Sequence, residues 1–277
     1  MQFVQGMKAA ALAAAVLVAA ACGSTPRIGQ AQDAFNEGAR IEAAAAARSV
    51  DPQIANQAAD SKYELALNIA DAGIQADGDA LAADKLLGVA YTVKAMAQWR
   101  LGDLRDDLTV AVAATKTVRH ALDKAGGEKR ELSLGTRDAV LFKALEGVAD
   151  VVRARLSKDA YDAPDTGPRD CCKSALAALS EAVAGGDLPA DHSIRVWVGL
   201  CRLRACEQWM AAISKNKAFS PQQMIAESDA AVAAWKEHAG ALKPFFRGHE
   251  KLADMVRLSG RLMGLDDTTL NSLLTVT

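Results

Sequence analysis

The sequence predicts an all-α fold of antiparallel helical hairpins, stacked either as a regular array or as an irregular bundle. Apolar residues recur at spacings of three and four along most of the 277-residue chain, which gives each helix one face to bury. Prolines and glycines fall between these stretches, where helices end. Alternating β-branched runs, the pattern typical of strands, are scarce.

The expected helices follow in order from these stripes and breaks. Asp51-Pro52 and Ser220-Pro221 each place a capping residue before a proline, which is typical of a helix start. Short turns at glycines join successive helices, so sequence neighbours are expected to be antiparallel. The predicted helices span 28–49, 52–77, 79–101, 104–125, 131–157, 171–184, 190–215, 221–241, 245–263 and 266–274.

The longest predicted loop divides these helices into two sets. It covers 158–170 and contains Pro164, Gly167 and Pro168. We therefore expect N-terminal hairpins over 28–157 and C-terminal hairpins over 171–277, with the second set packed on the first.

The first 24 residues have the character of an export signal. Lys8 precedes an uncharged, alanine-rich run over 9–21, which ends in small residues before Cys22. At 13 residues this run is shorter than the about 20 that a membrane-spanning helix needs. The alternative is an alanine-rich N-terminal helix of a cytoplasmic protein. Met1 and Met7 are both candidate translation starts.

The small residues followed by Cys22 resemble the lipobox of bacterial lipoproteins. The resemblance implies that a signal peptide over 1–21 is removed and that Cys22 is lipidated, for instance with palmitate. Residues 22–27 would then be a tether that holds the domain at a membrane of the cell envelope, facing the periplasm. In enterobacteria aspartate after the lipidated cysteine favours the inner membrane, so Gly23 favours the outer membrane.

Composition argues against several other classes of protein. The net charge of −2 and the pI near 6.1 give no basic excess for binding nucleic acid. Aromatic residues make up only 5%, whereas alanine supplies much of the 51% hydrophobic content. Alanine is the best helix former and lets helices approach closely. No apolar stretch after residue 21 is long enough to span a membrane.

Four cysteines follow Cys22, and an even number in an exported chain favours disulfides. A turn centred near residue 188 would place Cys172 opposite residue 204. This favours a Cys172–Cys201 bond, with Cys171–Cys206 as the second pairing. Free buried thiols and a metal or redox site are the alternatives. A zinc site is disfavoured because Cys201 and Cys206 would point roughly 140° apart on one helix.

Motifs for catalysis and cofactor binding are absent from the sequence. It has no zinc-protease histidine pair, nucleophile elbow or phosphate-binding glycine loop. We therefore expect no catalytic residue, no cofactor and no metal. Histidines 238 and 249 are expected on solvated faces and His192 at a helix start, and the four tryptophans in the core.

Residues 91–122 resemble a tetratricopeptide-type hairpin. Tyr91 opens the motif, and Ala111 and Ala114 put small residues on the second helix, while the first helix closes with Ala95, Trp99, Leu101, Gly102 and Asp103. The resemblance implies stacked hairpins with a concave binding face and no chemistry of their own. It is the type of domain found in periplasmic adaptor lipoproteins, so a protein-binding adaptor or scaffold is the expected function. The alternatives are an uptake accessory that resembles the helical-repeat lipoproteins of TRAP-type transporters, an enzyme of unknown type, and a purely structural role.

Overall fold

Every regular element in the described part of the chain is helical, which confirms the predicted fold class. The computed structural model describes residues 26–46, 52–126, 136–184, 189, 193–247 and 250–275. These residues contain no strand. Their elements are α2 (Pro26–Ala46), α3 (Pro52–Ala83), α4 (Leu87–Arg105), α5 (Leu108–Gly126), α6 (Thr136–Leu156), α7 (Pro168–Ala184), α8 (Ser193–Lys215), α9 (Pro221–Leu242), the 3-10 turn η2 (Lys243–Phe245), α10 (Glu250–Leu262) and α11 (Asp267–Leu274).

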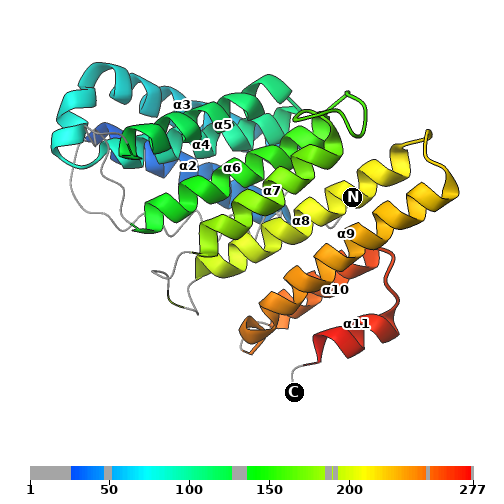
Figure 1. The fold of residues 1–277 in the computed structure, drawn as a ribbon. Helices are drawn as coiled ribbons and strands as arrows, with labels where there is room; N and C mark the ends of the chain where they lie inside the picture. The colour runs from blue at the N-terminus through cyan, green and yellow to red at the C-terminus, as the bar shows by residue number, and fades with distance from the viewer. Residues whose placement is uncertain are drawn as a thin grey trace.

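The helices form a stack of hairpins with two kinds of helix. Each helix from α2 to α8 packs against the next helix along the chain, and α10 packs against α11 (Figure 1). The even-numbered helices also contact one another in the order α2, α4, α6, α8, α10. They therefore form a continuous row, and the odd-numbered helices flank it. This is the arrangement expected of a helical-repeat array.

Two predicted breaks differ from the structure. The break expected at Gly78 is a kink at Asp77 (φ −125°, ψ 20°) within α3, which continues to Ala83. The turn expected at Gly102-Asp103 lies further on, because α4 continues to Arg105 and ends at Asp106 in the left-handed conformation (φ 53°). Aspartate adopts this conformation more readily than most residues, so Asp106 can end α4 without a glycine.

Gly102 instead allows two helices to approach closely. A Cβ atom at this position would lie 2.8 Å from the backbone nitrogen of Ala111 in α5. A similar close approach recurs in the hairpins α2–α3, α6–α7, α8–α9 and α10–α11, where an added Cβ would lie 2.3–2.9 Å from a side-chain atom of the second helix. The pairs are Gly38 with Tyr63, Gly102 with Ala111, Gly147 with Leu179, Gly199 with Leu242 and Gly260 with Leu270.

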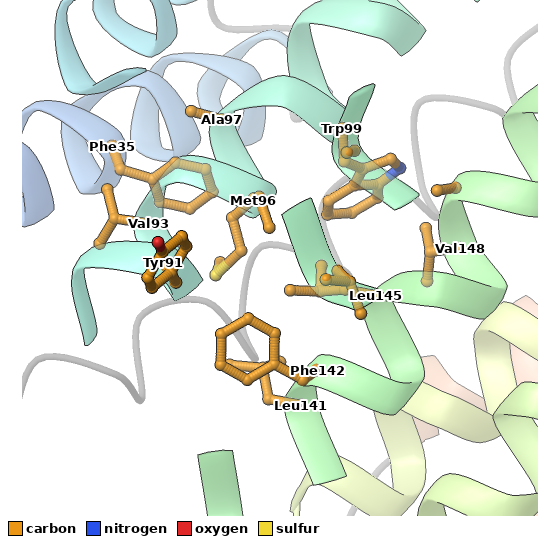
Figure 2. Close-up of a cluster of buried hydrophobic side chains, with 14 of the residues drawn as sticks. Phe35, Tyr91, Val93, Met96, Ala97, Trp99, Leu141, Phe142, Leu145 and Val148 are labelled. Carbon is orange, nitrogen blue, oxygen red and sulfur yellow. The ribbon is translucent and has the colours of Figure 1, made fainter. Parts of the chain in front are cut away.

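Two large apolar cores lie along the row. The first joins α2 to α8 and includes Trp197. It also includes Phe35, Trp99 and Phe142 (Figure 2). It includes side chains from both sides of the loop that precedes α7. The second contains side chains from the end of α6 and from α7, α8, α9, α10 and α11, and it includes Trp235. Within the described residues, no helix is both long and apolar enough to cross a membrane.

Candidate functional site

Some of the residues predicted to be functional lie outside the described part of the chain and others lie within it. Cys22 and the predicted signal lie outside the described residues. The predicted tether over 22–27 overlaps the first helix, because α2 begins at Pro26. The remaining cysteines are all buried free thiols, so neither predicted disulfide is present in the structure.

Helix geometry explains why the favoured Cys172–Cys201 pairing is not formed. Cys201 lies in the first core, whereas Cys172 and Cys206 lie together in the second. Five residues of helix rotate Cys201 and Cys206 about 140° apart, so only one of them can face α7. Burial raises the pKa of the Cys171 thiol to about 11 and the pKa of the Cys201 and Cys206 thiols to about 12. Such thiols react slowly near neutral pH.

The space between the even-numbered helices α4, α6 and α8 is filled by their own side chains. Trp99 of α4 and Trp197 of α8 meet across α6, with ring centroids 6.4 Å apart and planes inclined by 64°. Phe142 and Leu145 of α6 are 0% and 1% exposed. Side chains from α2, α4 and α6 converge on the same region (Figure 2). In the described part of the row, α4, α6 and α8 therefore meet in a packed core.

A buried ionic network joins α2, α3 and α4 near the C-terminal ends of α2 and α4. Arg100 donates from Nη2 and Nε to the two carboxylate oxygens of Glu42, at 2.6 and 3.1 Å. The Tyr63 hydroxyl also donates to Glu42, at 2.6 Å, and Arg100 Nη1 donates to Asp103 at 2.7 Å. Burial opposes the charge on Arg100, but the Glu42 and Asp103 carboxylates keep its pKa well above the ordinary value.

The network continues into α6 through Arg155. Its Nη2 donates to Asp103 at 3.1 Å and its Nη1 donates to Asp106 at 2.5 Å. This network was not predicted from the sequence. The sequence does contain one signal for it, because Arg100 is a charged residue between Trp99 and Leu101 in a helix that is apolar on nearly all sides.

The second core contains a smaller polar cluster. Trp235 Nε1 donates to Ser259 Oγ at 2.9 Å, and Ser259 donates to the buried Glu207. Burial raises the pKa of Glu207, although Arg204 contacts its carboxylate. His238 was expected on a solvated face, and this prediction is wrong because its side chain is buried.

Two surface hollows flank residues 157–159 at the C-terminal end of α6. The first has a volume of about 610 Å³ and lies between the α4–α5 turn and the loop before α7. Its wall includes Leu108 and Lys158, with three basic and three acidic side chains in all. The second, about 280 Å³, lies against the C-terminal half of α8 and has three basic side chains and one acidic one, Asp159. Both hollows can hold polar or charged groups.

Within the described ranges, no group of three or more histidine, cysteine, aspartate or glutamate side chains is placed to hold a metal ion.

The chain can be compared with family models, with curated proteins and with solved structures. No family model, curated protein or solved structure matches it. A proposal of function therefore rests on the sequence around Cys22, the helical fold and the two hollows.

Proposed function

We propose that this chain is a lipid-anchored helical-repeat lipoprotein of the cell envelope that acts as a protein-binding adaptor or scaffold. The observation that carries the proposal is the combination of a lipobox-like Cys22 with a row of stacked hairpins that begins four residues later. Stacked hairpins are built mainly to present surface to other proteins.

The two hollows are the best candidate for the surface that meets the partner. They lie side by side, since both include the segment 157–159, and both are lined by charged as well as apolar side chains. Protein interfaces combine an apolar centre with a polar rim. Leu108 fits this pattern, because it is 41% exposed at the first hollow and surrounded by charged residues.

The packing of the even-numbered helices argues against the alternative function, an accessory for small-molecule uptake. A small-molecule accessory needs an apolar cavity or a pore within the array. Where α4, α6 and α8 meet, Trp99, Phe142 and Trp197 occupy that space. This packing favours the adaptor over the uptake accessory.

Site-specific photocrosslinking in the native membrane tests the proposal. A photoreactive phenylalanine replaces Leu108 or Lys158 at the hollows, with Lys236 on the exposed side of α9 as the matched control position. We expect the two hollow positions to give the same discrete protein adduct and Lys236 to give none. Adducts that are absent from both hollow positions, or equal at all three, would refute the adaptor at this surface.

The lipid anchor is tested separately. The mass of the mature N-terminal peptide should correspond to an acylated Cys22, and Cys22→Ala should leave the signal peptide uncleaved and unacylated. An unmodified Cys22 in the native chain would refute the anchor.

A further inference from the structure

The tether between the proposed lipid and the first helix is very short. Only residues 23–25 separate Cys22 from Pro26, where α2 begins. Four residue steps span at most about 14 Å even when fully extended. A lipidated Cys22 would therefore hold the N-terminal end of α2 close to the membrane surface.

Ion pairs show which other elements share that end. Arg27, in the first turn of α2, pairs with Asp77 at 2.9 Å, so the kink of α3, which leads to the α3–α4 turn, lies beside the start of α2. At the opposite end, Glu42 of α2 pairs with Arg100 of α4, and Asp103 of α4 pairs with Arg155 of α6. Helices α2, α4 and α6 therefore run parallel, with their C-terminal ends together.

The hollows lie at this second end. They are formed by the α4–α5 turn, the end of α6, the loop before α7 and the end of α8. The same loop and the α8–α9 turn project on one side of the molecule, at the upper right of Figure 1. The 21 residues of α2 measure about 32 Å along the helix axis, so about one helix length separates the end with the hollows from the end with the anchor.

The side of α2 that other helices leave uncovered is unsuited to lying on lipid. Its exposed side chains include Arg27, Gln30, Asp33 and Arg40. These polar groups keep most of their hydration when they face water and lose it against a bilayer. Contact through the end that carries the α3–α4 turn leaves Gln30, Asp33 and Arg40 in water.

We infer that the array stands on the membrane, with the α3–α4 turn facing the lipid and both hollows facing away from it toward a partner in the aqueous phase. This orientation rests on the proposed lipid anchor. The hollows would then be presented about one helix length, roughly 30 Å, above the bilayer.

Fluorescence quenching on vesicles tests the orientation. The acylated full-length protein is inserted into phosphatidylcholine vesicles that contain a headgroup nitroxide quencher. A fluorophore is attached to one introduced cysteine at a time: Asp84→Cys in the α3–α4 turn, Leu65→Cys on the exposed side of α3, or Lys217→Cys in the α8–α9 turn. The unsubstituted protein, whose thiols in the described region are all buried, controls for background labelling.

We expect strong quenching at position 84, weaker quenching at 65 and none at 217. Equal quenching at 65 and 84 would mean that the array lies flat, and stronger quenching at 217 would mean the reverse orientation. Either result would overturn the inference while leaving the anchor intact. Failure of the anchor itself appears as an unacylated Cys22 in the peptide mass, which distinguishes the two.

Discussion

Replacing Arg100 by methionine should destabilise the protein strongly. The Arg100 side chain is 3% exposed and forms two hydrogen bonds to Glu42, which is equally buried and also accepts from Tyr63. Methionine keeps most of the volume and apolar contact of the arginine stem. The substitution therefore removes the charge and its hydrogen bonds and leaves the Glu42 carboxylate buried beside an apolar side chain.

The expected loss follows from this burial. Removing one partner of a buried ion pair costs about 3–5 kcal/mol, because the remaining charge is desolvated without compensation. For a chain of this size, 1 kcal/mol corresponds to about 2–4 °C in melting temperature, so Arg100→Met should lower Tm by roughly 6–20 °C. Adding Glu42→Gln should recover part of the loss, because it removes the unpaired charge and keeps an acceptor for the Tyr63 hydroxyl.

Arg105→Met is the matched control on the same helix. Arg105 also binds carboxylates, those of Asp60 and Glu64, but its side chain is 37% exposed. Exposed pairs contribute about 0–1 kcal/mol, so this variant should melt close to the native protein. Thermal melts followed by circular dichroism, with urea unfolding of the same variants, provide the comparison. Equal losses for the two arginine variants would refute the reasoning.

Three further outcomes can be measured on the same protein. Gly102→Ala should cost about 1–3 kcal/mol, because its Cβ would overlap the backbone of Ala111, whereas Gly29→Ala, with open space around it, should stabilise α2 by about 0.5–1 kcal/mol; equal effects in urea unfolding would contradict the close approach. Burial raises the pKa of Glu207, so the folded state binds a proton that the unfolded state has released, and the free energy of unfolding should fall as pH rises above the unfolded value. Relative to Glu207→Gln, the native chain should therefore gain stability between about pH 7 and pH 4, and parallel curves for the two proteins would exclude the effect. The buried thiols should resist alkylation in the folded protein and all react in urea under non-reducing conditions, and fewer than four reactive groups would reveal a disulfide among Cys171, Cys172, Cys201 and Cys206.

Sequence pattern predicted the helical class and most helix positions because apolar periodicity and proline caps are local signals. Ser220-Pro221 is an example: the Ser220 side chain accepts from the Gln223 backbone, and α9 begins at Pro221 as expected. The α3–α4 turn was missed because it contains neither glycine nor proline, and Lys85 adopts a positive φ of 60° there. Gly102 was assigned to a turn because a glycine that separates helices and one that lets them touch look alike in sequence.

The candidate site was harder to predict because it depends on contacts between distant segments. Glu42 and Arg100 are separated by 58 positions, and no local pattern links them. The same holds for the two hollows, which bring the end of α6 beside the end of α8. Helical period showed that Cys201 and Cys206 point apart, but only packing could show which of them joins Cys172.

Helix α8 contributes side chains to both cores, with Trp197 and Cys201 in the first and Leu203 and Trp209 in the second. Arrays whose repeats touch only their neighbours can unravel progressively from an end. Here, loosening either core would expose one side of α8, and the other core also depends on α8. The two halves should therefore melt in a single cooperative transition, and a fragment that ends at the loop before α7 would lack the α7 and α8 side chains that complete the first core.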